Sequence, residues 1–368
     1  MGSHHFAELH AHSYFTFLEG ADAPEDYVSS ARNLDLSALA LLEVDGMYSL
    51  IRALQAAKES SFPLLIGSEL TLDVGQFSRY QSPKEPAKGW GLPKGWEDRG
   101  IRLPVLTTSA QGYRDLCHLM SEYTLTHDAQ ESPAHGLGNI AQMGDIRILT
   151  GGSRGPLRRI LHAQGHTQAD RFLKDLIALF GRERVLLESV LMPGQDDLGR
   201  ELAELAQANC LTLVASAAPV MAYPQSKYRA DLLCSLRQGR SLDDLQYRLP
   251  AQHAFLRSAE EMLALHRSAP QAVNNAFECA NECYYPLSFD SLDLPDTEVP
   301  PGHTTISWLR ELTYSRAVEI YGKRSAHPQA WQVIDHELAI IEKLDFAGYF
   351  LIVHDIVDFC RRSGIMCQ

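Results

Sequence analysis

The sequence lacks several features that mark particular classes of protein. None of its apolar runs reaches the roughly 18 residues that a membrane-spanning helix needs, and no apolar stretch of a secretory signal follows the opening Met-Gly-Ser-His-His. Cysteine is scarce, and the seven cysteines are odd in number and scattered, which favours reduced thiols over a disulfide framework. These absences predict a cytoplasmic protein that has no membrane partner.

Positive charge is also in short supply. The 368 residues include 33 Lys and Arg against 46 Asp and Glu, which gives a net charge of −13. A protein that binds DNA mainly through its own surface normally carries a basic face. We therefore expect any contact with nucleic acid to be local, or to be made by parts outside this chain.

Two histidines near the start of the chain are the first sign of chemistry. His10 and His12 lie in the segment Phe6–Ser13. Their side chains are expected on the same side of a strand, because side chains alternate along a strand with a period of two. Two imidazoles that share one side are a good start for a transition-metal site.

Short apolar runs, each followed by a helical pattern, repeat along the first 216 residues. This alternation predicts a parallel α/β sheet. Seven repeats, with His10, His12, Glu43 and the loop after residue 216 at strand ends, favour a barrel, in which the chemistry lies at the carboxyl ends of the strands. The seven runs are 6–12, 38–43, 64–72, 102–108, 146–150, 184–191 and 211–216.

Two segments interrupt the pattern. Residues 75–100, rich in proline, glycine and basic residues, are expected to form a mobile excursion or, alternatively, a hairpin on which Trp90 and Trp96 dock. Residues 286–305 are rich in proline and predict an extended linker. Because the chain stops soon after a last apolar helix, we expect a fragment of a longer protein. The helical patterns that follow the linker cover 308–321, 330–344 and 349–361.

Two further features allow more than one interpretation. The segment Gly151–Pro156 opens a helix and is followed by Arg158 and Arg159, so it could bind phosphate, or Ser153 could cap the helix beside solvated arginines. Glu188 follows the apolar residues of the sixth run and could reach the mouth of the barrel, or it could serve on the surface or in a salt bridge.

Motifs spread over nearly the whole chain are shared with one family. On these motifs the chain resembles the bacterial C-family DNA polymerases, the alpha subunits of polymerase III, and most nearly their error-prone, repair-associated branch. The last two motifs are long and specific, whereas the first occurs in many enzymes. The motifs cover 8–12, 66–70, 112–117, 149–152, 299–312 and 348–359.

The resemblance implies two domains. The first, over 1–285, is a polymerase-and-histidinol-phosphatase (PHP) domain with a distorted seven-stranded (β/α)7 barrel. The second, over 286–368, is a linker and a partial, mostly helical first part of the polymerase palm. In the family the catalytic palm carboxylates lie beyond the residues present here. We therefore assign no catalytic residue and do not expect the fragment to polymerise DNA by itself.

The resemblance also implies substrates and partners. The intact protein would be a DNA-directed DNA polymerase that transfers deoxynucleotides in DNA replication or error-prone repair. It would act on DNA and dNTP and use Mg²⁺ as its cofactor. The sliding clamp and translesion accessory proteins are further candidate partners.

The family's metal site is only partly present in this sequence. In metal-binding members nine ligands hold up to three ions. Four of the nine positions keep a residue that can bind a metal, namely His10, His12, Glu19 and Glu69. The other five carry Val44, Arg102, Gly152, Ala218 and Val220, none of which is a metal ligand.

Arg102 sharpens this interpretation, because it places a fixed positive charge where a cation would lie. At ~4 Å and an effective dielectric near 20, two unit charges interact by about 4 kcal/mol. We expect Arg102 to fill the vacated pocket and to pair with Glu69 or Glu43, which would leave a metal-free, structural barrel. Alternatively, two histidines and one glutamate could hold a single Zn or Mn, with Asp45 as a substitute ligand. That arrangement would leave an active phosphoesterase or 3′–5′ exonuclease. A module that acts only through partners is a third hypothesis.

Overall fold

The computed structural model describes residues 5–80, 100–126, 134–245, 253–287 and 297–367. Contacts divide the chain into two compact units, Met1–Pro286 and Leu287–Gln368. Residues 81–99 lie outside the described part, so neither expectation for the segment 75–100 is tested there. Within the described residues, no helix combines the length and the apolar character that crossing a membrane requires.

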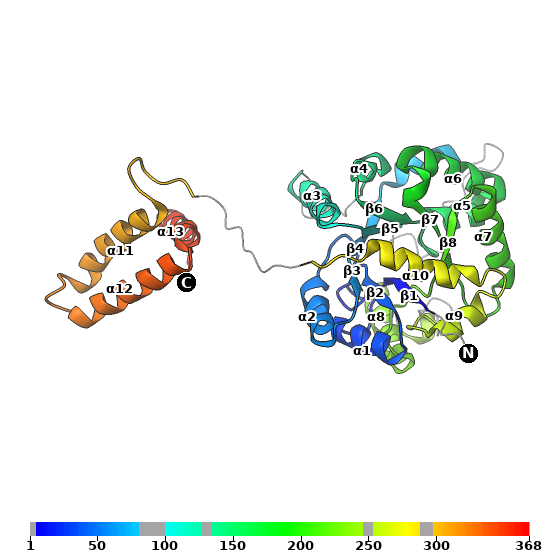
Figure 1. The fold of residues 1–368 in the computed structure, drawn as a ribbon, viewed down its shortest axis with the longest axis horizontal. Coiled ribbons are helices and arrows are strands. Elements are labelled where there is room, and N and C mark those ends of the chain that lie inside the picture. The colour runs from blue at the N-terminus through cyan, green and yellow to red at the C-terminus, as the bar shows by residue number, and fades with distance from the viewer. Residues whose placement is uncertain (1–4, 81–99, 127–133, 246–252, 288–296, 368) are drawn as a thin grey trace. The chain divides into compact units, whose positions relative to one another are not determined.

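The strands of the first unit form two sheets rather than one continuous barrel. β1 (Ala7–Ala11), β2 (Ala38–Leu41) and β3 (Leu64–Leu65) make a parallel three-stranded sheet in the order β1-β2-β3. The second sheet has the order β4-β5-β6-β7-β8. Its strands are β4 (Gly67–Leu72), β5 (Ile101–Thr107), β6 (Ile146–Leu149), β7 (Val185–Val190) and β8 (Thr212–Ser216). Figure 1 shows both sheets inside a ring of helices.

The expected third strand, 64–72, is in fact two strands. The chain leaves one sheet after Leu65 and joins the other at Gly67. A Cβ atom at Gly67 would lie 2.1 Å from the carbonyl oxygen of Val105, so only glycine allows the two backbones to approach so closely at this change of sheet.

The expectation of a wholly parallel sheet is wrong for β5. This strand is antiparallel to both β4 and β6, whereas β6, β7 and β8 run parallel to one another. The reversal brings the amino end of β5 to the edge where the carboxyl ends of its neighbours lie. Arg102, the second residue of β5, therefore reaches that edge.

The two sheets approach each other at both ends. On one side, Val44 and Glu69 form an isolated parallel bridge, and the Glu69 N–H donates to the carbonyl of Glu43 at 3.0 Å. On the other side, the Glu8 carboxylate accepts hydrogen bonds from Ser216 Oγ at 2.6 Å and the Ala217 N–H at 2.9 Å. A side chain, rather than a run of backbone pairs, thus links the first strand to the last.

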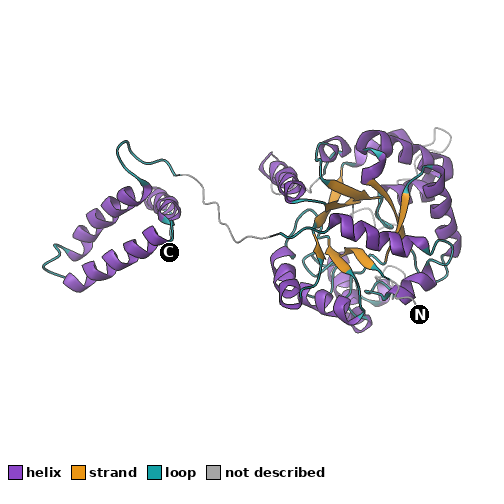
Figure 2. Ribbon diagram, viewed as in Figure 1, coloured by secondary structure: helices purple, strands orange, loops and turns teal. Residues whose placement is uncertain are grey.

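Helices cover the sheets of the first unit (Figure 2). They bury apolar residues at helical spacing. In α6, for example, Ala169, Phe172, Leu173, Leu176 and Phe180 are buried. Burying a side chain such as Leu contributes about 1.5–3 kcal/mol. The helices are α1 (Pro24–Asn33), α2 (Leu50–Ser60), α3 (Ala110–Thr126), α4 (Leu137–Ala141), α5 (Pro156–Gln164), α6 (His166–Phe180), α7 (Asp196–Ala208), α8 (Lys227–Gln238), α9 (Ala259–Leu265) and α10 (Gln271–Cys283). The 3₁₀ turns are η1 (Val74–Tyr80), η3 (Arg182–Arg184), η4 (Pro224–Ser226) and η5 (Asp243–Leu245).

The second unit contains three described helices, at the places where the sequence patterns predict them. They are α11 (Thr305–Tyr321), α12 (Pro328–Lys343) and α13 (Ala347–Arg362). Thr304 caps α11 by accepting the Ser307 N–H, and Ser307 Oγ in turn accepts the Thr304 N–H. A small core cluster of the second unit consists of Leu309, Leu338, Ala347 and Leu351.

Candidate functional site

Three of the four predicted metal-binding residues lie together at the carboxyl edge of the first unit, by which we mean the edge of its sheets where the carboxyl ends of the parallel strands lie. His10 and His12 lie in and just after β1, and Glu69 lies on β4. The Nε2 atoms of His10 and His12 are each 3.3 Å from a different carboxylate oxygen of Glu69. All three side chains are buried, and one ligand atom from each falls within 4.8 Å of the others. The group has the composition of a small metal site.

Glu188 adds a second carboxylate to His10. This side chain comes from β7 and is fully buried, and its Oε1 lies 2.9 Å from His10 Nδ1. Of the interpretations left open for Glu188, the surface role is wrong: the side chain reaches His10 at the barrel mouth and forms an ion pair with it there. A carboxylate on one ring nitrogen fixes the orientation of the imidazole and directs the other nitrogen toward Glu69.

The two histidines differ in charge because their neighbours differ. Burial alone would lower the pKa of His10, but Glu188 and Glu69 outweigh burial and raise that pKa to about 10. Burial also lowers the pKa of His12, and there the charges of Glu69 and Glu19 do not outweigh burial, so that this pKa falls to about 3. One imidazole therefore carries a proton and the other stays neutral at pH 7.

Arg102 points into the same group. Its Nη1 lies 3.4 Å from Glu69 Oε2, and Nη1 and Nη2 donate to the two oxygens of Glu19 at 3.0 and 3.2 Å. The prediction that Arg102 pairs with a carboxylate is confirmed for Glu69. It is wrong for Glu43, whose carboxylate accepts bonds from the hydroxyl groups of Ser13 and Thr16, both at 2.5 Å.

Glu19 lies apart from the three-residue group, because guanidinium groups surround it. Besides Arg102, it contacts Arg154, which precedes α5, and Arg237 of α8, whose Nη1 is 2.9 Å from Glu19 Oε1. Burial raises the pKa of the Glu19 carboxyl, but the three arginines outweigh burial and hold that pKa well below its usual range. The neighbours of Glu19 are thus cationic side chains.

The remaining family positions show why a larger cluster is not built here. Val44 pairs with Glu69 through the backbone only. The carboxylate of Asp45, the suggested substitute ligand, accepts hydrogen bonds from the Thr71 N–H at 2.7 Å and the Thr71 hydroxyl at 2.6 Å. Asp45 is not part of the three-residue group. A Cβ at Gly152 would meet the Val190 side chain at 3.3 Å. None of these positions supplies a ligand atom to the group of His10, His12 and Glu69 at the barrel mouth.

The donor set therefore fits one metal ion and does not fit three. The Nε2 atoms of His10 and His12 are buried and lack a hydrogen bond of good geometry, so together with Glu69 they could hold an ion once His10 has lost its proton. A three-ion cluster needs bridging ligands between the cations. At the corresponding positions this chain places the guanidinium of Arg102 and the arginine-bound carboxylate of Glu19.

The start of α5 differs from the simple capping interpretation. Gly155, not Ser153, is the N-cap, no side chain caps the helix, and Ser153 is exposed. Arg159, in the first turn, is 91% buried, and its Nε and Nη2 have no hydrogen-bond partner. Burial, followed by the nearby charges of Arg154 and Arg102, lowers the pKa of Arg159 to about 10. In the sequence, Arg159 stood out as a candidate binding residue only because it follows the glycine-rich start of a helix.

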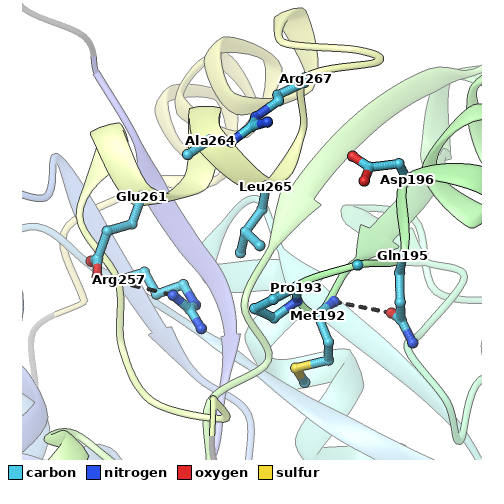
Figure 3. A pocket seen from close by; sticks show the side chains of 10 residues that line it. Met192, Pro193, Gln195, Asp196, Arg257, Glu261, Ala264, Leu265 and Arg267 are labelled. Atoms are coloured by element: carbon cyan, nitrogen blue, oxygen red, sulfur yellow. Dashed lines mark hydrogen bonds and ion pairs between the residues drawn. The ribbon is translucent and has the colours of Figure 1, made fainter.

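A separate hollow lies between α9 and the loop that follows β7 (Figure 3). It has a volume of about 320 Å³, and Met192, Pro193 and Leu265 form apolar parts of its wall. The buried guanidinium of Arg257 lies beside it, 4.0 Å from Glu261. Nothing in the sequence pointed to this hollow, because its lining residues come from segments far apart in the chain.

Comparison with known proteins places these features in a family. The PHP domain model matches residues 8–190, and the model of the bacterial DNA polymerase III alpha NTPase domain matches residues 307–368. An error-prone DNA polymerase of Nocardia farcinica is 36% identical over 395 aligned residues, which cover 99% of this chain and 34% of that protein. The one from Mycolicibacterium paratuberculosis is 37% identical, over 99% of this chain and 32% of that protein.

Among solved structures, an amidohydrolase from Chromobacterium violaceum matches 58% of this chain and 87% of its own, with a TM-score of 0.40 and 14% identity. The chain spans about a third of the length of the curated relatives that it matches. From its two family matches and its similarity to error-prone DNA polymerases along nearly its whole length, the chain belongs to the bacterial DNA polymerase III alpha family.

Proposed function

We propose that this chain is the N-terminal region of an error-prone DNA polymerase in which the PHP unit has a structural role. The intact protein would extend DNA with dNTP, using Mg²⁺ at palm carboxylates that are not in this chain, and would work in the cytoplasm with the sliding clamp and translesion accessory proteins. The observation that carries the structural role is the buried contact of Arg102 with Glu19 and Glu69.

The architecture supports the same proposal. The two sheets meet at the Val44–Glu69 bridge and again where Glu8 accepts bonds from Ser216 and Ala217. We regard them as one distorted barrel of the PHP type whose ring is closed partly by side chains. Such a barrel can brace neighbouring parts of a polymerase without any chemistry of its own.

Electrostatics explains how arginines can take the place of metal ions. The buried carboxylates at the mouth need positive charge, and in the family metal ions supply it. Here Arg102 supplies it to both Glu19 and Glu69, with two bonds to Glu19 in the fork geometry that suits a guanidinium. A divalent ion near Arg102 would be repelled by roughly twice the ~4 kcal/mol that two unit charges feel at ~4 Å.

A second function remains in view because one donor set is intact. His10, His12 and Glu69 could hold one Zn or Mn, with Glu188 orienting His10. A bound ion would supply Lewis-acid polarisation of a phosphoryl oxygen. The alternative is therefore a metal-dependent phosphoesterase or 3′–5′ exonuclease.

Metal content separates the two functions. We would saturate the purified chain with Zn²⁺ or Mn²⁺, dialyse it and measure bound metal, together with hydrolysis of a phosphate monoester and of a DNA 3′ end. We expect well under one ion per chain, and no hydrolysis that depends on His10. Stoichiometric metal, together with hydrolysis that His10→Ala abolishes, would establish the phosphoesterase instead.

A positive control is available in the same chain. The double variant Val44→His and Arg102→His restores two of the family's ligands and removes the competing cation. We expect this variant to retain more metal after dialysis than the unmodified chain, which shows that the assay detects a repaired site.

A further inference from the structure

Guanidinium groups outnumber carboxylates at one place on the carboxyl edge of the first unit. Three arginines contact Glu19, and Glu69 shares one of them while also facing His10. Arg159 lies in the first turn of α5, the helix that begins just after Arg154, and its side chain is buried. This small region is thus positive within a chain whose net charge is −13. The arginines are Arg102, Arg154, Arg159 and Arg237, here called the arginine cluster.

The arginine cluster has more hydrogen-bond donors than Glu19 can accept. Nε of Arg102, Nε of Arg237, and both Nε and Nη2 of Arg159 are buried and have no hydrogen-bond partner. Leaving buried donors of charged groups unpaired is costly. A carboxylate offers two oxygens to three arginines, whereas a phosphate offers more oxygens and a second negative charge.

The start of α5 adds to this preference for an anion. Arg154 directly precedes the N-cap residue Gly155, and no side chain caps the helix. The first N–H groups of a helix have no partner within the helix, and together with the helix dipole they favour negative charge nearby. The buried, partly unpaired guanidinium of Arg159 is a second and independent sign of an anion site.

We propose that the arginine cluster is a binding site for a phosphate-class dianion and that the Glu19 carboxylate is its resident occupant in this structure. Glu19 then acts as a built-in gate, which an incoming dianion displaces by turning the side chain aside. This inference rests on the proposed function in one respect: the cations of the mouth are guanidinium groups, not metal ions.

Chemical rescue tests the proposal. In Glu19→Ala the cluster loses its resident anion, so the variant should melt below the unmodified chain. Inorganic phosphate, titrated in EDTA, should raise its melting temperature in a saturable way. We expect an apparent phosphate affinity at least about tenfold tighter than that of the unmodified chain, because no side chain competes for the site. Chloride at equal ionic strength should not rescue it.

Matched variants make the result specific. Adding Arg159→Ala to Glu19→Ala should abolish the saturable rescue. Glu25→Ala, which removes a carboxylate paired with the single surface arginine Arg52, should show no response to phosphate beyond that to chloride. If Glu19→Ala does not fold, Glu19→Gln keeps the shape of the side chain, and phosphate binding can be measured directly by equilibrium dialysis.

Three outcomes would overturn the inference: equal phosphate affinity with and without Glu19, rescue by chloride as strong as by phosphate, or rescue that persists without Arg159. Phosphate binding that appears only after Zn²⁺ or Mn²⁺ is added would also overturn it, by placing the anion on a metal ion. The metal content of the unmodified chain tests the proposed function separately, so the two can fail independently.

Discussion

Arg102 shows how a single buried side chain can supply positive charge to two carboxylates. The family resemblance predicts that it stands where metal-binding members have a ligand, and it is 92% buried against Glu19 and Glu69. A buried ion pair does not by itself add much stability, but removing one partner leaves the other charge uncompensated. The contribution of Arg102 to stability is therefore best measured by replacing its side chain with an uncharged one.

We predict that Arg102→Leu lowers the free energy of unfolding by about 2–4 kcal/mol, because Glu19 and Glu69 each lose a buried cation. Denaturant unfolding measures the loss. Arg147→Leu is the matched control: Arg147 pairs with the exposed Glu282, and breaking such a surface pair costs less than about 1 kcal/mol. Equal and small losses in the two variants would show that Arg102 does not compensate the mouth carboxylates.

At the scale of elements, α9 contacts the end of β7, the strand that carries Glu188. The imidazole of His266, at the C-terminus of α9, lies with its two nitrogens 3.0 Å from the carbonyl oxygens of Met262 and of Ser189 on β7. The ring is buried, and burial lowers its pKa below the ordinary 6.5 despite the two carbonyl contacts. We therefore expect the packing of α9 on β7 to depend on pH through His266.

The sign of this sensitivity follows from the direction of the pKa shift. The unfolded chain takes up a proton near pH 6.5 and the folded chain does so only at lower pH, so the contribution of His266 is complete above pH 6.5 and falls as the pH drops below it. We predict that His266→Gln reduces the loss of stability between neutral and mildly acidic pH, by at most about 1.4 kcal/mol per pH unit. Denaturant unfolding at several pH values gives the slopes, and identical slopes would contradict the assignment.

At the scale of the whole molecule, the two units differ in how well they bury their apolar surface. The first unit has an extensive core, whereas only six hydrophobic side chains are buried in the described part of the second unit. On α13, Phe350, Val353, Ile356 and Phe359 are 38–59% exposed. Exposed apolar side chains of this kind promote association.

We predict that the chain self-associates as its concentration rises and that Ile356→Glu with Phe359→Glu reduces this association. Stability should change by only about 0.5 kcal/mol, because both side chains are largely exposed. Size-exclusion chromatography with light scattering measures the mass. His354→Ala, a change on the same helix that removes no apolar side chain, is the control. A chain that remains monomeric at all concentrations would show that this face does not drive association.

How much of the fold the sequence reveals depends on the range of the interactions. Alternating apolar runs and helical patterns predict the strands and helices well, because these patterns reflect local geometry. They do not reveal that β5 runs against its neighbours or that residues 64–72 divide between two sheets. Strand direction and pairing depend on contacts between distant segments, which a local pattern does not encode.

The candidate site divides in the same way. The sequence by itself determined which residue stands at each position of the predicted metal site, His10, His12 and Glu69 among them, and it determined the family motifs, because each of these is a matter of residue identity at a position. Only the tertiary structure decided that Glu188 would bond to His10 and that Arg154 and Arg237 would join Arg102 around Glu19. These groups come from segments 83 to 218 residues away from their partners, and only folding brings their opposite charges within hydrogen-bonding distance, in a buried place where they interact strongly.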